Sequence, residues 1–383
     1  MFLAVQIIFW LCLATLAYVY AGYPILVILM GKFFSKKIVR GTIEPTVTVL
    51  ITAFNEEAAI AAKIDNTLKI EYPSDKLEIL VASDGSTDRT DEIVRSFADR
   101  DVRLFRQEGR VGKTITQNNA VELSAGEIVL FSDATTQYPT DILRRLLPAF
   151  ADETVGCVAG RLIYKDDSET NVGSGAKSYW SYETLLKQSE SNVCSLIGAS
   201  GCLYAVRREA YRPMYAEACS DFLICTELYR QGLRSVFEPD ATCYEMTNVD
   251  AGDEMRMRIR VISQTFTDLW RNRDMLLPFR SGFFAVELIS HKLLRYAVPL
   301  ILLLLFAANG VAAMHSIFYS AVFVGQILFY TTALIGLLLE KAGVKLSLLF
   351  IPLYFVLANV ASVIGFYKFL SGERFAAWEP IRE

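Results

Sequence analysis

Three aspartates of this sequence stand where carboxylates can act on a phosphorylated ligand. Asp84 and Asp133 each come directly after a run of apolar residues, and Asp221 opens a helical pattern after Ser220, a candidate N-cap. One carboxylate can accept a hydrogen bond from a base or ribose, a second can hold a hard cation against a diphosphate, and a third can take the proton of an attacking hydroxyl. Turn formation and helix capping are the structural alternatives for all three aspartates.

Basic residues near these aspartates can neutralise phosphate. Lys113 follows Gly112 at the start of a helical pattern, and Arg256, Arg258 and Arg260 lead a second pattern whose apolar residues recur at spacings of three and four. Such an amphipathic helix can lie along a membrane surface, with one arginine, Arg260 by preference, reaching a leaving diphosphate. A solvated loop lysine and lipid headgroup contacts are the alternatives.

The elements that must position these side chains alternate between strand and helix. Predicted strands cover 47–53, 77–83, 102–106 and 128–132, and helical patterns follow the first two strands and cover 114–123. This alternation is typical of an α/β fold with a mostly parallel sheet and flanking helices. Because ligands bind beyond the carboxyl ends of such strands, we expect the polar clusters at the strand ends to share one crevice.

Composition divides the chain into a globule and membrane segments. Hydrophobic residues make up 53% of the 383 residues, and the mean hydropathy is +0.32, with the apolar excess at both ends of the chain. The net charge of −4 offers no basic field for a nucleic-acid backbone, so we expect no nucleic-acid partner. Seven cysteines without a C-x-x-C pair, and only two histidines, indicate neither a zinc site nor a disulfide framework.

The predicted order of segments places one globule between transmembrane helices. It comprises a transmembrane helix at 1–31, a globular domain at 42–252, amphipathic interface helices at 253–285, about three transmembrane segments at 286–370 and a tail at 371–383. The basic residues that follow the first helix, among them Lys36 and Lys37, predict a cytoplasmic globule in a multi-pass protein of the inner or plasma membrane. Simple alternation then puts the tail outside, whereas Lys368, Arg374 and Arg382 favour the inside. The last segment is therefore either re-entrant or an exception to the charge rule.

Read in order, the polar motifs resemble the inverting family-2 glycosyltransferases of the GT-A, Rossmann-like fold. They are Asn55-Glu56-Glu57, Asp84-Gly85-Ser86-Thr87-Asp88, Gly112-Lys113, Asp133-Ala134-Thr135, Gly198-Ala199-Ser200-Gly201, Ser220-Asp221-Phe222 and the arginine helix. With the flanking apolar helices, the chain looks like the membrane branch that includes the hyaluronan, cellulose and poly-N-acetylglucosamine synthases.

The resemblance implies a role for each motif. The donor-binding residues would be Asn55, Glu57, Asp84, Lys113, Asp133 and Arg260, with Asp84 at the nucleobase and Asp133 also binding Mg2+ or Mn2+. Asp221 would be the general base. The acceptor would bind at Gly198, Ser200 and Gly201, where small residues let a sugar approach the backbone.

Two positions depart from the family pattern. Where members often show Asp-x-Asp, the second carboxylate is replaced by Thr135, so the metal would rest on one aspartate and the donor. The Gln-x-x-Arg-Trp motif of processive members aligns with a segment that ends at Arg260 and Val261 and lacks both Gln and Trp.

The expected function is transfer of a sugar from a nucleotide-sugar, a uridine diphosphate sugar by analogy, to a growing exopolysaccharide. A single addition to a lipid or lipid-linked acceptor is the alternative. The expected partners are the donor, the acceptor and the bilayer, with accessory export proteins a further expectation. A transporter or scaffold with a nucleotide-sensing domain is a third reading, but it does not need three carboxylates around one crevice.

Overall fold

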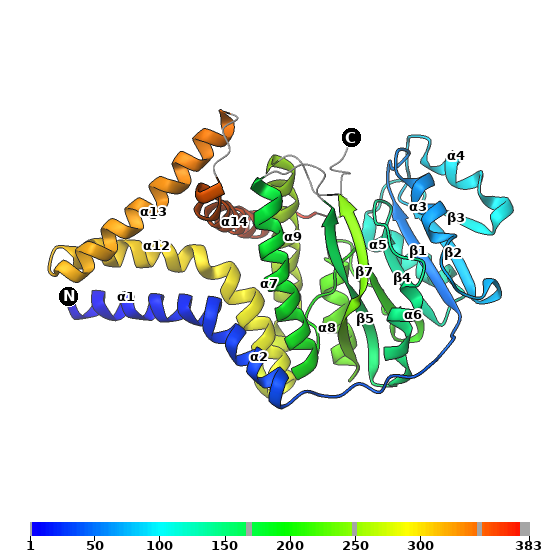
Figure 1. Cartoon of the computed structure of the whole chain (residues 1–383), viewed down its shortest axis with the longest axis horizontal. Coiled ribbons are helices and arrows are strands. Elements are labelled where there is room, and N and C mark those ends of the chain that lie inside the picture. Colours follow the sequence, from blue (N-terminus) through cyan, green and yellow to red (C-terminus); the bar gives the residue numbers. More distant parts are fainter. Residues whose placement is uncertain (1, 166–170, 247–250, 343–346, 376–383) are drawn as a thin grey trace.

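The structure, a computed structural model, describes residues 2–165, 171–246, 251–342 and 347–375 of the 383-residue chain. An α/β domain lies at one end and a group of long apolar helices at the other, with the helices α7 and α9 between them (Figure 1). The predicted tail, 371–383, is described only as far as Phe375, so Arg382 lies outside the described residues.

Seven strands form a single sheet in the order β3-β2-β1-β4-β6-β5-β7. They are β1 (Val47–Ala53), β2 (Leu77–Ser83), β3 (Val102–Arg106), β4 (Ile128–Asp133), β5 (Val155–Lys165), β6 (Tyr204–Arg207) and β7 (Arg234–Met246). Strand β6 runs antiparallel to β4 and β5, and the other pairs are parallel. The predicted α/β fold with a mostly parallel sheet is confirmed.

Helices cover both faces of the sheet. Those of the α/β domain are α3 (Ile60–Thr67), α4 (Thr90–Arg95), α5 (Lys113–Leu123), α6 (Ile142–Leu146) and α8 (Ser220–Arg230), with 3-10 turns at Ser74–Lys76, Ala98–Arg100, Leu147–Ala151 and Arg208–Ala210. Every residue of β1 is buried, as expected for a central parallel strand covered on both sides. Apolar residues of α3, α4 and α6 pack on one face, and those of α5 and α8 pack on the other.

Two long helices join this domain to the apolar end of the molecule. They are α7 (Asn171–Val193) and α9 (Ala251–Arg271), and α9 is followed by a 3-10 turn at Arg273–Leu276 and the short helix α10 (Pro278–Ser281). The predicted interface segment, 253–285, thus corresponds to α9 and the short elements after it.

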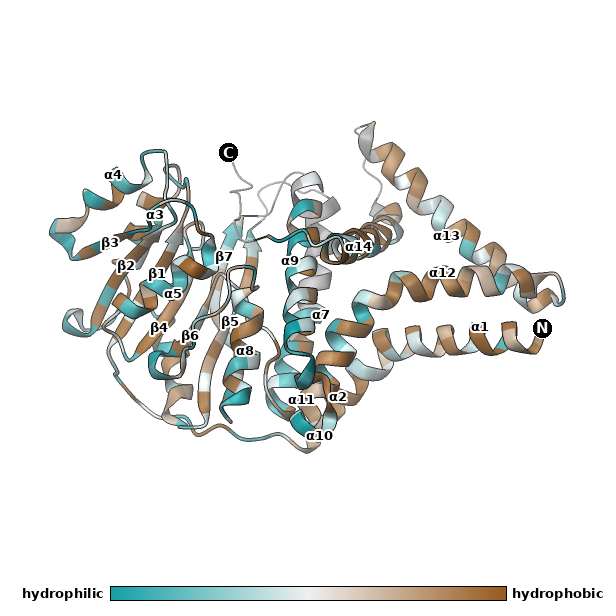
Figure 2. Cartoon of the chain, turned by 180° about the vertical axis from the view of Figure 1, so that it is seen from behind, coloured by the Kyte–Doolittle hydropathy of each residue, from teal (hydrophilic) through white to brown (hydrophobic). Residues whose placement is uncertain are grey.

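The apolar end consists of α1 (Phe2–Ala17), α2 (Tyr23–Phe33), α11 (Phe283–Glu287), α12 (Leu294–Ala313), α13 (Ile317–Lys341) and α14 (Ser347–Leu370), with π-helical turns at Tyr18–Gly22 and Leu288–Leu293. Four stretches of the described residues are long and apolar enough to cross a membrane: Phe2–Phe33, Phe283–Ala313, Ile317–Leu339 and Ile351–Leu370. Hydrophobic residues dominate these helices along their length (Figure 2).

Candidate active site

Asp84 follows β2 and organises the loop that leads to α5. Its carboxylate is fully buried and accepts hydrogen bonds from the backbone N–H groups of Val111 (2.8 Å) and Gly112 (3.0 Å) and from Thr116 Oγ1 (3.0 Å). Gly112 has a φ of +95°, which an L side chain rarely adopts. Asp84 therefore has a structural role that the sequence did not indicate: its carboxylate fixes the start of α5, the helix that carries Lys113. Its contact with a nucleobase stays a prediction.

Lys113 and Asp133 form an ion pair at the carboxyl end of β4. Lys113 Nζ donates to Asp133 Oδ1, and the two side chains are 24% and 31% exposed, so a ligand can reach the pair. Burial alone would lower the pKa of Lys113, but Asp133 and then Asp221 outweigh burial, and the pKa is raised. Lys113 is therefore a stable cation between two carboxylates.

Asp221 borders the same space from the first turn of α8. A Cβ added at Gly201 would lie 3.4 Å from Asp221 Oδ2 and 3.5 Å from Lys113 Nζ, so the glycine keeps open the space that both groups face. Cys219 Sγ donates to Asp221 Oδ1 at 3.1 Å, and burial followed by Asp221 raises the pKa of this thiol well above its usual value. Ser220 is the first residue of α8 and not its N-cap, which is Cys219.

Arg260 approaches these carboxylates from α9. Burial lowers the pKa of its guanidinium, and Cys219, Asp133 and Asp221 oppose that effect. Arg260 also lowers the pKa of Lys113, which places the two cations near each other. The structure thus brings together Lys113, Asp133, Asp221, Arg260 and Gly201, five of the residues selected from the sequence.

The other selected donor residues hold the wall of the site. Asn55, in the left-handed region with a φ of +52°, accepts a hydrogen bond at Oδ1 from Thr87 N (2.8 Å). Glu57 Oε2 accepts one from Arg89 N at 3.0 Å. Both side chains therefore bind the end of β1 to the loop after β2.

The other two residues selected for the acceptor, Gly198 and Ser200, contact neighbouring elements of the site. A Cβ added at Gly198 would lie 3.2 Å from the Phe222 ring, and Ser200 Oγ accepts a hydrogen bond from Lys187 Nζ (3.0 Å) of α7. Between them, Ala199 N donates to the backbone carbonyl of Asp221 at 2.9 Å. The segment 198–201 is thus attached to the first turn of α8 and to α7.

Lys63 is a buried residue of this region that the sequence analysis missed. It lies on the apolar face of α3, fully buried, and donates to Ser132 Oγ (2.8 Å) and to the carbonyl oxygen of Thr136 (2.7 Å), on either side of Asp133. Its Nζ also lies 3.7 Å from the centroid of the Tyr138 ring. Burial lowers its pKa to about 7. The available signal was a lysine at an apolar position of the helical pattern.

The side chains present fit a divalent cation that the donor helps to hold. Among the residues that the structure describes, no group of three or more His, Cys, Asp or Glu side chains is arranged to hold a metal ion. Asp133 is an accessible carboxylate, and Mg2+ is commonly held by one or two carboxylates together with substrate phosphates and water. An ion bound in this way would offset negative charge on a diphosphate.

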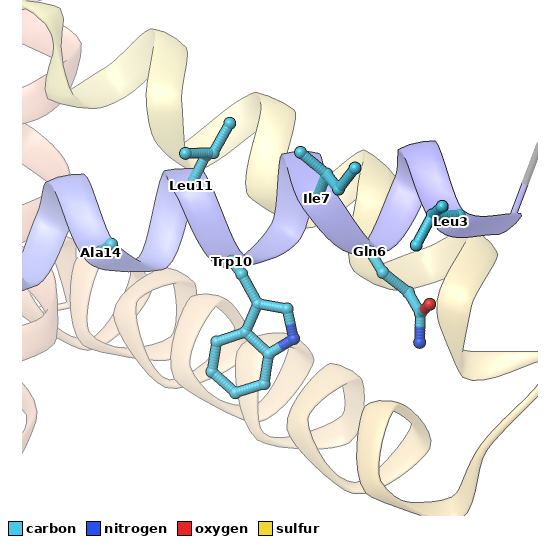
Figure 3. Close-up of a pocket in the computed structure, with 6 residues that line it drawn as sticks. All are labelled: Leu3, Gln6, Ile7, Trp10, Leu11 and Ala14. Atoms are coloured by element: carbon cyan, nitrogen blue, oxygen red, sulfur yellow. The ribbon is translucent and has the colours of Figure 1, made fainter.

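A pocket outside this site lies on the first apolar helix. It has a volume of about 550 Å³ and is lined by Leu3, Gln6, Ile7, Trp10, Leu11 and Ala14, all on α1 (Figure 3). Because its lining is mostly apolar and lies on a candidate membrane span, we do not assign it to the chemistry described above.

Parts of the chain are similar in sequence to known glycosyltransferases. Residues 48–213 match the model of the family described as Glycosyl transferase family 2. The Beta-monoglucosyldiacylglycerol synthase of Nostoc sp. is 30% identical over 179 residues, which cover 46% of this chain and 38% of that protein. The Poly-beta-1,6-N-acetyl-D-glucosamine synthase of Staphylococcus aureus is 24% identical over 221 residues, which cover 56% of this chain and 53% of that protein. The chain thus spans about half or less of the length of these relatives.

One solved structure resembles nearly the whole chain. The mannosyltransferase PcManGT from Pyrobaculum calidifontis, in complex with GDP-Man and Mn2+, superposes with a TM-score of 0.73 at 24% identity, covering 96% of this chain and 100% of that one. The likeness concerns the fold, including the apolar helices. The likeness shows a fold of the GT-A type, and the stretch that matches the family 2 glycosyltransferase model, residues 48–213, begins at β1 and extends past β6.

Proposed function

We propose that this protein transfers one sugar from a nucleotide-sugar to a lipid acceptor at the membrane surface, with inversion at the anomeric carbon. The observation that carries the proposal is the meeting of Lys113, Asp133 and Asp221 around the space kept open by Gly201. This space adjoins α9, which packs against the apolar helices. Donor chemistry and lipid can therefore meet at one place.

The side chains divide the reaction between them. Asp133, with Mg2+ or Mn2+, and the cations Lys113 and Arg260 would bind the diphosphate, while Asn55, Glu57 and Asp84 would shape the nucleoside side. The acceptor hydroxyl oxygen attacks the anomeric carbon, its proton passes to Asp221, and the bond to the diphosphate breaks with its electron pair leaving on the phosphate oxygen. Attack from the face opposite the leaving group inverts the configuration.

The choice of a lipid acceptor rests on α9 and on the relatives. Val261, at the position of the tryptophan in processive members, packs into the apolar cluster that includes Val27 and Leu269, so it supplies no aromatic surface for a sugar chain. The relative at 30% identity is named for a glycolipid product.

A growing polysaccharide is the second candidate acceptor, supported by the relative named as a Poly-beta-1,6-N-acetyl-D-glucosamine synthase. For the donor we propose a uridine diphosphate sugar. For the location we propose a cell membrane with the catalytic domain in the cytoplasm.

The test is turnover by purified protein in phospholipid vesicles that contain diacylglycerol, with Mn2+ or Mg2+ and radiolabelled UDP-glucose, UDP-N-acetylglucosamine or GDP-mannose in separate reactions. We expect label in the chloroform–methanol phase, in a product that is one sugar heavier than the acceptor by mass spectrometry. Labelled material in the aqueous phase that elutes as a polymer would favour the second candidate instead. Folded protein that consumes none of the donors, with either acceptor present, would contradict both.

A further inference from the structure

The direction of α14 relative to the membrane can be derived from its contacts. By length and composition this helix qualifies as a span, since its 24 residues extend roughly 36 Å at 1.5 Å per residue, more than the ~30 Å of a bilayer's hydrocarbon core. Length therefore cannot decide whether it crosses.

The end of the apolar helices that lies far from the α/β domain is marked by contacts among α1, α12 and α13. Phe2 stacks on His315, in the turn between α12 and α13, with ring centroids 4.6 Å apart. Phe9 contacts Tyr319 of α13 at 5.0 Å. The apolar cluster at this end contains residues of α1, α12 and α13, and none of the residues named in it belongs to α14.

Helix α14 begins beside the returning half of α13. A Cβ added at Gly336, near the end of α13, would lie 3.4 Å from Leu349 Cβ and 3.5 Å from Leu353 Cβ of α14. Because α13 starts at the far end, its second half lies toward the α/β domain, and α14 begins there.

The remainder of α14 packs on α9. Arg258 donates to Tyr354 OH near the start of α14, and a Cβ added at Gly365 would lie 2.8 Å from Ile262 Cγ2. Near the end of α14, Phe369 stacks on Phe266 with ring centroids 5.8 Å apart. Contacts with α9 therefore extend from the first third of α14 to its last turn.

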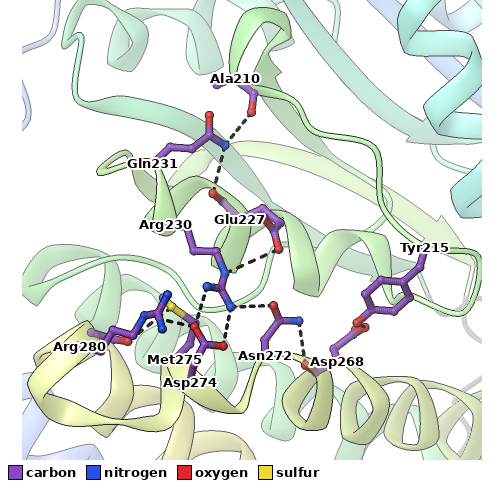
Figure 4. Close-up of polar contacts among 11 residues, drawn as sticks. Ala210, Tyr215, Glu227, Arg230, Gln231, Asp268, Asn272, Asp274, Met275 and Arg280 are labelled. Carbon is purple, nitrogen blue, oxygen red and sulfur yellow. Dashed lines mark hydrogen bonds and ion pairs between the residues drawn. The ribbon is translucent and has the colours of Figure 1, made fainter.

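Helix α9 in turn is fixed to the catalytic domain. Asp268 of α9 is buried and accepts hydrogen bonds from Tyr215 OH and from Cys219 N (3.1 Å), two residues before Asp221. The α8 residue Arg230 binds both Asn272 and Asp274 just after α9 (Figure 4). A helix that lies along α9 therefore lies along the membrane side of the catalytic domain.

The chain after α14 stays on that side. Gln264, one helical turn after Arg260 on α9, donates from Nε2 to the carbonyl oxygen of Phe375 at 2.7 Å. In Figures 1 and 2, α1 and α12 run lengthwise across the view whereas α14 is seen nearly end-on. The two views agree that α14 takes a different direction from the helices that reach the far end.

We propose that α14 does not cross the membrane but begins and ends on the catalytic-domain side, embedded in the hydrocarbon of that leaflet. Its partner is lipid acyl chain, because α14 is apolar on all sides and its surface away from α9 exposes Val360, Val363 and Tyr367. A helix can lie in hydrocarbon because its backbone bonds are satisfied internally. Three helical segments then cross the membrane, and Lys368 and Arg374 lie on the same side as the catalytic domain, which removes their conflict with the charge rule.

The test compares the sidedness of three single cysteines introduced into the full-length protein. Glu373→Cys lies after α14, Asp75→Cys lies on the catalytic domain, and Met314→Cys lies in the far turn, where Met314 is 83% exposed. The seven native cysteines are buried, so the unmodified protein serves as the labelling background. Sealed vesicles of each orientation are treated with a membrane-impermeant maleimide and compared with detergent-solubilised samples.

We expect Glu373→Cys to react in the same vesicles as Asp75→Cys, and Met314→Cys to react in those of the opposite orientation. Reaction of Glu373→Cys together with Met314→Cys would overturn the proposal. Ser371→Cys, also exposed, repeats the measurement if loss of the Lys368–Glu373 ion pair lowers the yield. The labelling result does not depend on enzymatic activity, so it tests the position of α14 independently of the proposed function.

Discussion

At the scale of single residues, the candidate site is balanced in charge before a donor binds. Lys113 and Arg260 carry two positive charges, and Asp133 and Asp221 carry two negative charges in the same small space. A diphosphate that arrives with a divalent cation preserves this balance, because Lys113 can exchange its bond to Asp133 for a phosphate oxygen while Asp133 binds the ion. The Lys113–Asp133 pair is therefore preorganised for the donor complex, with Lys113 for the diphosphate and Asp133 for the divalent cation.

The first prediction concerns Asp221→Asn. Asparagine keeps the shape of the side chain but cannot accept the proton of the acceptor hydroxyl, so we expect kcat to fall by about 10²–10⁴-fold with little change in the KM for the donor. Steady-state kinetics with the donor that supports turnover measure both constants. The exposed Asp99→Asn on the same domain should behave as the unmodified enzyme. An Asp221→Asn variant with undiminished kcat would remove Asp221 from the reaction.

The second prediction concerns Lys63→Met, which keeps the length of the side chain and removes both buried hydrogen bonds. Two buried acceptors next to Asp133 then lose their donor, at ~1–3 kcal/mol each. We expect a lower Tm and, because the segment 132–136 is loosened, a several-fold higher Mn2+ concentration for half-maximal activity. The matched control is Lys69→Met, an exposed lysine just after the same helix. A lower Tm with unchanged Mn2+ dependence would limit Lys63 to a purely structural role.

Residue type and spacing select candidate site residues, but they do not give the local contacts of those residues. Asp133 and Asp221 were selected from their positions after a strand and at a helix start, which a single chain segment is enough to reveal. By residue type Thr87 could cap the helix that follows β2, whereas in the structure Asp88 Oδ1 accepts from Thr90 N (3.0 Å) and Thr87 N donates to Asn55 Oδ1 (2.8 Å). The hydrogen-bond partner of Thr87 lies 32 residues away in the sequence, and the periodicity of apolar residues cannot predict such a distant contact.

At the scale of elements, α7 connects the acceptor segment to the apolar helices. Glu183 of α7 binds His291 (3.1 Å) and Arg295 (3.0 Å) beyond the catalytic domain, and one turn later Lys187 binds Ser200. Burial would raise the pKa of Glu183, but His291 and Arg295 outweigh burial and hold this pKa well below its usual range.

The third prediction therefore compares a buried with an exposed ion pair. Glu183→Gln removes the carboxylate that pairs with Arg295 and with His291 Nε2, while His291 Nδ1 keeps Glu190, and we expect a cost of about 3–5 kcal/mol for this buried pair. Glu373→Gln loses an exposed pair with Lys368, at ~1 kcal/mol or less. Thermal unfolding in detergent should show a clear loss of Tm for the first variant only. An equal Tm for both variants would contradict a structural role for the cluster.

The Glu183→Gln variant also gives a pH dependence. Because the folded-state pKa of Glu183 is depressed, its stabilisation is complete above the unfolded-state pKa, about 4.3, and is lost as the pH falls through the folded-state value. The difference in Tm between the unmodified protein and Glu183→Gln should thus be full at pH 7 and shrink below about pH 4.5. A difference that grows on acidification would have the wrong sign.

Most of the strands predicted from sequence have continuous apolar runs. The strands β1, β2 and β4 are largely buried and read as apolar segments, whereas β3 is an edge strand with two arginines; the limits of all four were predicted within one residue. The second half of the sheet was not predicted. Strand β6 has only four residues, and β7 combines buried positions with the partly exposed Pro239 and the exposed Asp240, so neither shows a continuous run or a regular alternation.

At the scale of the whole molecule, composition separated the globule from the apolar helices but could not orient the last helix. The sequence left α14 either re-entrant or in conflict with the charge rule, because hydropathy measures length and not direction. The contacts of α14 with α9 supply the missing information, since they relate it to the catalytic domain. The distribution of basic residues then predicts on which side of the membrane the catalytic domain lies.

The fourth prediction is that the catalytic domain faces the cytoplasm. Lys32 in the last turn of α2 and Lys36 and Lys37 just after this helix are exposed, whereas the turn between α12 and α13, residues 314–316, contains no lysine or arginine. In intact cells we expect an impermeant maleimide to label Met314→Cys, and to label Asp75→Cys only after the cells are permeabilised. Replacing the three lysines by glutamine should weaken this preference, because the charge difference between the two sides falls. Labelling of Asp75→Cys in intact cells would invert the arrangement and put the sugar donor on the other face of the membrane.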